Sequence, residues 1–216
     1  MKTALIVYGG WEGHYPSETA NILRELLEAE YFSVTLRDSL DALESVERLQ
    51  DYQLIIIHWT QGEITSAQFD VLRQAVYGGV GLAGIHGGLG DAFRNVPEYQ
   101  YMVGGQWVAH PGNDAVTYDV HILDQEHPIT RGISDFSVTS EQYYMHIDPA
   151  IHTLATTQFG DTTMPVAWTK RYGFGKVFYH SLGHKPEIVR MQEVSKLTRR
   201  GMLWAASDKE ASPWRE

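Results

Sequence analysis

Four histidines stand where buried stretches of the chain come to an end. They are His14, His58, His86 and His184. Imidazole exchanges protons near neutral pH and, as a neutral ring, ligates transition metals. Such a set favours general acid–base or metal-assisted chemistry, the alternative being that each ring is an ordinary surface or structural group.

His86 occupies the most informative position, after the apolar stretch 81–85 and directly before Gly87 and Gly88. A strand that breaks at such a turn into a helix presents one side chain beside backbone N–H groups. In α/β hydrolases that side chain is a Ser or Cys nucleophile. The chain contains no cysteine, so thiol chemistry is excluded. We expect Gly87 and Gly88 to line a binding site next to His86.

Glu141 is the best candidate acid, because the surrounding stretch 138–144 is too aromatic for an ordinary solvated loop. Its carboxylate is expected to orient a histidine or to act as a general base, and Tyr143 is a candidate for binding substrate. A surface glutamate at a turn is the alternative. Asp91, five residues after His86, is expected only to favour the dipole of the next helix.

Neutral imidazoles with one carboxylate are a known ligand set for zinc or iron. No H-x-x-x-H or H-x-E pair occurs at the candidate positions, so such ligands would have to converge through the fold. The sequence leaves a divalent metal such as zinc open and names no ligands for it. A phosphate loop is discarded, because no Gly-Lys-Ser/Thr follows the glycines of 87–90.

Further histidines and aromatic residues flank these positions. His110 precedes Pro111-Gly112 and either reaches the site or caps a turn, whereas His127 is expected to bond the backbone of its own turn. Aromatic rings offer flat apolar faces on which a ligand stacks, although core packing explains each ring as well. The rings in or beside the candidate loops are Trp11, Trp59, Trp107, Tyr143 and Tyr144. The histidines without an assigned role are His121, His146, His152 and His180.

The elements that must position these residues alternate along the first half of the chain. Strands are predicted over 3–8, 32–36, 52–58 and 81–85. One intervening helix is predicted to be capped by Ser17, and another to open with a capping box of Thr65 and Gln68. This alternation indicates a parallel sheet of βαβ units, and ligands bind beyond the carboxyl ends of such strands. We therefore expect the four histidines at one edge of the sheet.

The second half of the chain is less regular. The predicted elements are an edge or antiparallel strand over 116–123, short strands over 152–157 and 166–170, a buried strand over 175–184 and a final helix over 187–206. No repeat or linker interrupts the chain. One α/β domain is therefore expected over 1–210, followed by a C-terminal tail over 211–216.

The bulk composition excludes several classes of function. A formal net charge of −10 over 216 residues argues against a nucleic-acid partner, which needs a basic face. The chain has no apolar run of about 18 residues that would span a membrane, and its start lacks the pattern of a signal peptide. The absence of cysteine removes disulfides and Cys-ligated zinc. A cytoplasmic protein is expected.

Motifs spread over nearly the whole chain resemble those of the ThuA-like (trehalose utilisation) family. They are Gly84-Ile85-His86-Gly87-Gly88, Gly104-Gly105 with His110-Pro111, His127-Pro128-Ile129-Thr130, Glu141-Gln142-Tyr143, Pro165-Val166-Ala167-Trp168 and the stretch 173–184. The fold of this family is related to that of class I glutamine amidotransferases. The resemblance implies a single-domain, flavodoxin-like three-layer sandwich with a mostly parallel central sheet.

The same resemblance places His86 where amidotransferases carry their nucleophilic cysteine, and His184 as the counterpart of their triad histidine. The triad acid two residues beyond that histidine is missing, because position 186 is Pro and Glu187 is one step off. This chain thus departs from amidotransferases at both nucleophile and acid, which argues against glutamine hydrolysis.

The resemblance implies a role in catabolism of trehalose or a related disaccharide or keto-sugar. We expect proton transfer by His86, His184 and Glu141. The expected substrate-binding residues are His14, His58, Trp59, Gly87, Gly88, His110 and Tyr143. A non-catalytic sugar-binding or regulatory protein and a metal-dependent hydrolase are the alternatives. The expected partner is a small sugar, without nucleic acid or membrane, and a homo-oligomer stays open.

Overall fold

The computed structural model describes residues 1–207, so the predicted tail 211–216 lies outside the described residues. The first half contains β1 (Lys2–Gly10), α1 (Pro16–Glu28), β2 (Phe32–Arg37), α2 (Val46–Gln50), β3 (Leu54–Thr60), α3 (Ser66–Tyr77), β4 (Gly81–Ile85), α4 (His86–Gly90) and α5 (Pro97–Val103). The second half contains β5 (Gly105–Ala109), β6 (Val116–Ile122), β7 (Phe136–Ser140), β8 (Tyr144–Ile147), β9 (His152–Phe159), β10 (Thr162–Tyr172), β11 (Gly175–His180), α6 (Pro186–Val189) and α7 (Gln192–Ala205).

Within residues 1–207, nine strands form one sheet in the order β2-β1-β3-β4-β11-β10-β9-β6-β7. The strands from β2 to β11 run parallel to one another, in the flavodoxin order. Those beyond β11 pair antiparallel. A separate two-stranded sheet joins β5 and β8. The predicted α/β fold with a large, mostly parallel central sheet is confirmed.

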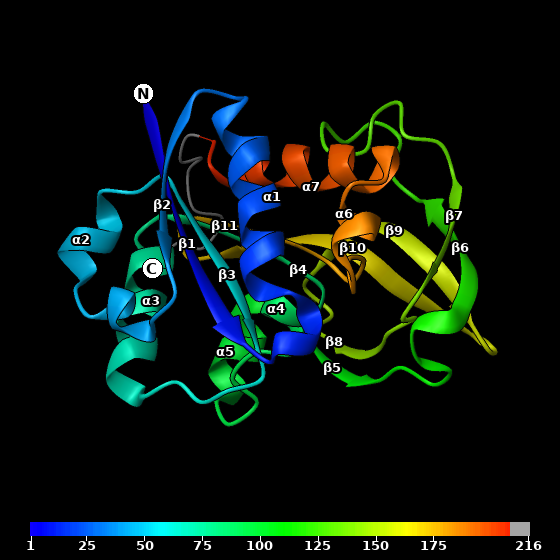
Figure 1. Cartoon of the computed structure of the whole chain (residues 1–216), viewed down its shortest axis with the longest axis horizontal. Coiled ribbons are helices and arrows are strands. Elements are labelled where there is room, and N and C mark those ends of the chain that lie inside the picture. The colour runs from blue at the N-terminus through cyan, green and yellow to red at the C-terminus, as the bar shows by residue number, and fades with distance from the viewer. Residues whose placement is uncertain (208–216) are drawn as a thin grey trace.

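Apolar residues on both faces of the parallel strands create two cores and hence three layers. In β1, Ala4 and Ile6 pack on the side of α1 and α7, where Leu23 and Leu197 meet them. The alternate residues of β1 face the side of α3 and α5. Figure 1 shows α1 lying across β1 and β3, with the antiparallel strands extending beyond α6. Burial on both faces explains why these strands read as continuous apolar runs.

Some helix boundaries differ from the prediction. Helix α1 begins at Pro16, and its N-cap is Tyr15 with a φ of 49°, so Ser17 lies inside the helix and does not cap it. The prediction missed that Pro suits the first helical turn, where no N–H is needed. The capping box of Thr65 and Gln68 is confirmed on α3. The single final helix is wrong: the extended backbone of Met191, with a ψ of 141°, separates α6 from α7.

The antiparallel half is more regular than predicted. Strand β6 pairs with β7 on one side and β9 on the other, so it is an internal antiparallel strand. Strands β9 and β10 are longer than the short segments that were predicted, and they pair antiparallel with a shift of register between Pro165 and Ala167. None of the helices in residues 1–207 is long and apolar enough to cross a membrane.

Candidate functional site

One histidine of the site follows each of three parallel strands, at their carboxyl ends. His14 ends a short 3₁₀ turn after β1, His86 is the first residue of α4 after β4, and His184 follows β11. Because these strands are parallel, their carboxyl ends meet at one edge of the sheet. The predicted convergence of His14, His86 and His184 is therefore what the strand order produces.

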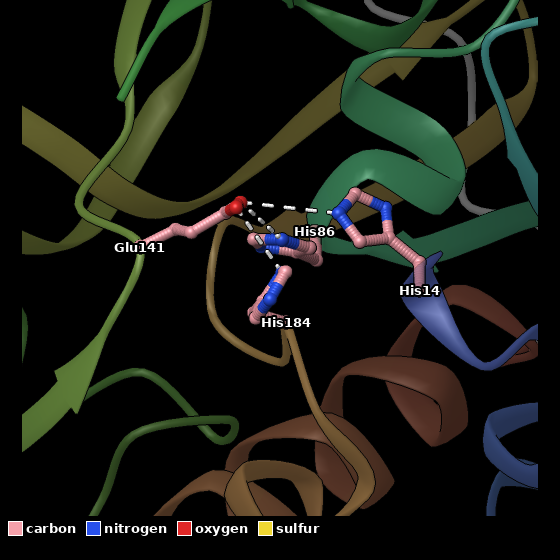
Figure 2. Close-up of side chains that lie close together, drawn as sticks. All are labelled: His14, His86, Glu141 and His184. Carbon is pink, nitrogen blue, oxygen red and sulfur yellow. Dashed lines mark hydrogen bonds and ion pairs between the residues drawn. The ribbon is translucent and has the colours of Figure 1, made fainter. Parts of the chain in front are cut away.

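A carboxylate from the antiparallel half completes the set. Glu141 directly follows β7, and its two oxygens face the three rings (Figure 2). Its Oε2 lies 3.1 Å from His86 Nε2 and 3.8 Å from His14 Nε2, and its Oε1 lies 3.3 Å from His184 Nδ1. One ligand atom from each of these four buried residues lies within 4.8 Å of the others. We call this set the His–Glu cluster.

His86 is held rigidly by groups on every side. Its φ of 50° is unusual for a residue with a side chain and marks the sharp turn between β4 and α4. Its Nδ1 lies 2.7 Å from the backbone oxygen of Ser181, and the hydroxyl of Tyr143 lies 2.8 Å from its Nε2. The hydroxyl of Tyr179 donates to its backbone oxygen at 3.0 Å. These contacts fix the ring so that Nε2 points at Glu141.

The other two rings of the cluster are also buried. His14 Nδ1 lies 2.8 Å from the hydroxyl of Thr60, which leaves Nε2 facing Glu141. The ring of His14 meets those of His86 and His184 edge to face, with centroids 4.6 and 5.1 Å apart. His184 Nδ1 has no hydrogen-bond partner among the described residues, although it is buried. This atom points at Oε1 of Glu141, 3.3 Å away.

Burial and mutual proximity set the protonation of these groups. Burial lowers the pKa of His86 to about 4, although its hydrogen bond with Glu141 opposes this effect. Desolvation alone would raise the pKa of Glu141, but its interactions with His14, His184 and His86 lower that pKa well below the ordinary value. The carboxylate is therefore charged at neutral pH, while His86 favours its neutral form.

Two further predicted residues reach the cluster. Tyr143 stacks on His86, with ring centroids 4.3 Å apart, and burial raises the pKa of its phenol well above 10, so it remains a donor. His110 Nδ1 lies 3.8 Å from Glu141 Oε1, and its side chain is 28% exposed. Of the two expectations for His110, reaching the site is therefore the one that the structure favours. His127 accepts from the backbone N–H of Ile129, as predicted for a turn.

Other predicted binding residues lie beside the cluster as packing groups. Neither ring nitrogen of buried His58 has a hydrogen-bond partner among the described residues. Burial, followed by the charges of His14 and His86, lowers the pKa of His58 to about 3. A Cβ at Gly88 would lie 2.2 Å from His58 Nδ1, and one at Gly87 would lie 2.6 Å from the His14 ring. These glycines make room for the two rings.

Trp59 belongs to a different environment from His58. It is partly buried against the core on the side of α3. A Cβ at Gly9 would lie 2.6 Å from its ring, and one at Gly62 would lie 2.5 Å from its Nε1. Trp59 and His58 are successive residues of β3, and they differ in environment because successive residues of a strand point to opposite faces. The contacts described for Trp59 are those of loop packing.

Sequence reasoning missed several residues that support the site. Thr60 and Ser181 hold the outer nitrogens of His14 and His86, and neither has a sequence signal beyond its place near a strand end. Asp91 follows α4 and does not start a helix, so the helix-dipole expectation is wrong. It binds Arg94 through two hydrogen bonds of 2.6 and 2.8 Å, and Arg94 in turn lies 4.6 Å from the ring centre of Trp107.

Two side chains that contact the cluster, Trp11 and His110, reach the surface of the protein. Trp11 is 48% exposed and meets the ring of His14 edge to face, and Trp107 flanks His110 with ring centroids 5.4 Å apart. A cavity of about 680 Å³ lies elsewhere, between Tyr77, Tyr101, Tyr172 and Trp204, and shares no residue with the cluster. The atoms of three imidazoles and one carboxylate that converge at the cluster identify it as the candidate site.

The cluster also differs from an amidotransferase triad. The elbow residue is a histidine, and Glu187, the acid nearest to the expected triad position, is exposed. In place of a nucleophile, a histidine and an acid in series, the four side chains of the His–Glu cluster meet at one polar point. Such a centre is able to exchange protons with a bound molecule or to ligate a cation.

Comparison with known proteins places the chain in a family. The family model described as ThuA, trehalose utilisation, matches residues 3–205. No curated protein matches the chain in sequence. A ThuA-like protein of Parabacteroides merdae is 18% identical over 99% of this chain and 92% of its own, with a TM-score of 0.79. A ThuA-like protein of Bacteroides uniformis is 18% identical over 98% of this chain and 94% of its own, with a TM-score of 0.80.

A protein of Salmonella typhimurium, described as cytoplasmic, has the same fold. It is 14% identical over 97% of this chain and 100% of its own, with a TM-score of 0.72. At these identities the solved structures support the fold alone, whereas the family model spans nearly all of the described residues. The chain belongs to the ThuA, or trehalose utilisation, family.

Proposed function

We propose that this protein is an enzyme of carbohydrate catabolism that transfers protons on trehalose or a related disaccharide or keto-sugar. The observation that carries the proposal is the His–Glu cluster, in which the oxygens of one buried carboxylate face imidazoles from three strand ends. The family description, trehalose utilisation, supplies the class of substrate. The label of the Salmonella neighbour supports a cytoplasmic location.

The chemistry of the cluster suits reactions beside a carbonyl. A hydrogen on the carbon next to a ketone is removed by a positioned base, and the resulting enolate takes its proton from a positioned acid. Glu141 is charged at neutral pH and is the base in this proposal. His86 and His184 lie next to it and complete the proton exchange. Enolisation, isomerisation and elimination all need this combination.

The surroundings of the cluster suit an uncharged ligand. Trp11 offers an exposed ring next to His14, on which the apolar face of a sugar stacks. The guanidinium of Arg94 is occupied by Asp91 through two hydrogen bonds, so it is not presented to a phosphate. We therefore propose a neutral sugar as substrate, in keeping with the acidic chain.

The test is incubation of the purified protein with trehalose and with its 3-keto derivative in heavy water. Nuclear magnetic resonance would follow products and the uptake of deuterium next to the carbonyl. The proposal expects deuterium uptake that is lost in His86→Ala, His184→Ala and Glu141→Gln. The exposed His121, which pairs with Asp135 outside the cluster, gives the control His121→Gln.

Two results would overturn the proposal. One is turnover that all three cluster variants retain. The other is calorimetric binding of the sugar without product or deuterium exchange, which would establish the non-catalytic alternative.

A further inference from the structure

The possible ligand atoms of the His–Glu cluster converge on one point. The backbone oxygen of Ser181 only accepts, so Nδ1 of His86 carries a proton. The other ring nitrogen, Nε2, is directed at Oε2 of Glu141 at 3.1 Å and at the hydroxyl of Tyr143 at 2.8 Å.

The other two rings repeat the pattern. The hydroxyl of Thr60 forms a hydrogen bond with His14 Nδ1, which leaves Nε2 as the atom that faces Glu141 at 3.8 Å. His184 Nδ1 lies 3.3 Å from the other carboxylate oxygen and makes no hydrogen bond among the described residues. Ring nitrogens from three separate loops thus point at one carboxylate.

The spacing of these atoms fits a metal ion. Bonds of about 2 Å from zinc to nitrogen and oxygen set the atoms of a tetrahedral shell roughly 3.3 Å apart. The distances from Glu141 to the three nitrogens, 3.1, 3.3 and 3.8 Å, bracket this value. All four residues are buried, so water competes poorly for the ligand atoms.

We propose that His14, His86, His184 and Glu141 together bind one divalent transition-metal ion, of which Zn²⁺ is the representative. The inference deepens the proposed function and rests on it only for the location of the site. Three imidazoles and one carboxylate favour zinc and related ions, whereas Mg²⁺ and Ca²⁺ prefer oxygen ligands. The carbonyl of Ser181 and the hydroxyl of Thr60 are the outer partners that metal-bound histidines usually have.

A bound ion would polarise a carbonyl or a hydroxyl group of the sugar. The ring nitrogens of His14, His86 and His184 would then be ligands. Proton exchange would fall to the oxygen of Glu141 that does not bind the ion and to His110, which is partly exposed and lies 3.8 Å from Glu141.

The test measures metal binding without any sugar. Protein stripped with a chelator is titrated with Zn²⁺ by calorimetry, and with Co²⁺ by its visible d–d absorption, which reports a low-symmetry nitrogen and oxygen shell. We expect one equivalent of metal per chain and a rise in melting temperature on binding. His184→Ala and Glu141→Gln are each expected to weaken binding by more than about tenfold and to change the cobalt spectrum.

Two control variants separate a built site from surface binding. His152→Gln and His121→Gln each remove an exposed histidine whose ion-pair partner lies outside the cluster. Both are expected to keep stoichiometric binding. The inference is overturned if the folded protein binds no stoichiometric Zn²⁺ or Co²⁺, or if His184→Ala and Glu141→Gln bind as the unaltered protein does. Metal binding without sugar turnover would remove only the proposed reaction, and sugar turnover by a protein that binds no metal would remove only the metal site.

Discussion

His86 and Glu141 are 55 residues apart in the chain, and yet His86 Nε2 lies 3.1 Å from Glu141 Oε2. His86 starts the helix after the central parallel strand β4, whereas Glu141 follows β7 at the antiparallel edge of the sheet. Their meeting joins the two halves of the molecule at one polar point. Each ring and oxygen of the His–Glu cluster takes its position from this contact or from a neighbour of it.

Replacement of Glu141 by Gln is expected to reduce sugar turnover roughly 10²–10⁴-fold, the range for loss of a general base. The amide has nearly the same shape as the carboxylate but carries no charge, and it cannot accept a proton. Rates with 3-keto-trehalose, measured together with circular dichroism and urea unfolding, would check the result. A folded variant whose rate stays within a few-fold of the original would contradict the role assigned to Glu141.

The sequence was sufficient to predict the parallel half of the molecule. Buried runs that end in polar residues placed His14, His86 and His184 at one sheet edge, because parallel strands share the direction of their carboxyl ends. The same rule included His58, whose ring instead packs against Gly88. Which face of a strand a terminal side chain takes depends on local packing, and the pattern of apolar residues does not specify it.

Glu141 could be nominated from the sequence but not placed. It follows an antiparallel strand, and the partner of such a strand is chosen by contacts distant in sequence. Only the aromatic residues around it, Tyr143 among them, distinguished it from a surface glutamate. The supports Thr60 and Ser181 carried no signal, because a hydroxyl and a backbone oxygen are common to every loop.

Gly88→Ala is expected to destabilise the fold by about 1–3 kcal/mol, the usual cost of overpacking. The new Cβ would lie 2.2 Å from His58 Nδ1 and 3.0 Å from the Cα of His58, so the strand as well as the ring would have to move. Gly78→Ala is the control, since its φ of −71° suits alanine and the nearest atom lies 3.2 Å away. Equal free energies of unfolding for the two variants would refute this packing role of Gly88.

Acidification is expected to destabilise the protein through its buried neutral histidines. Burial, followed by the charge of His86, lowers the pKa of His180 from 6.5 to about 3. The unfolded chain therefore binds a proton below about pH 6.5, whereas His180 in the native state stays unprotonated down to about pH 3. The contribution of such a histidine to the free energy of unfolding is fully present above about pH 6.5. Between about pH 6.5 and about pH 3, each pH unit removes about 1.4 kcal/mol of it.

His180→Gln, which can still bond the hydroxyl of Thr198, should lose less stability than the unaltered protein between about pH 7 and about pH 5. Urea unfolding at both pH values measures the difference. The exposed His121 supplies the control His121→Gln, for which the pH dependence should stay close to that of the unaltered protein. A His180→Gln protein that declines as steeply as the original would show that His180 does not contribute to the acid sensitivity.

Thr60→Val is expected to weaken Zn²⁺ binding about 10–100-fold, because outer partners of metal-bound histidines fix the ring and its tautomer. The hydroxyl of Thr60 lies 2.8 Å from His14 Nδ1, and valine has nearly the same shape without an acceptor. His14 would then be free to move its proton to Nε2, the atom that faces Glu141. Thr60→Ser restores the acceptor and should recover the affinity, whereas a purely structural role of Thr60 would leave affinity unchanged in both variants while shifting only the melting temperature.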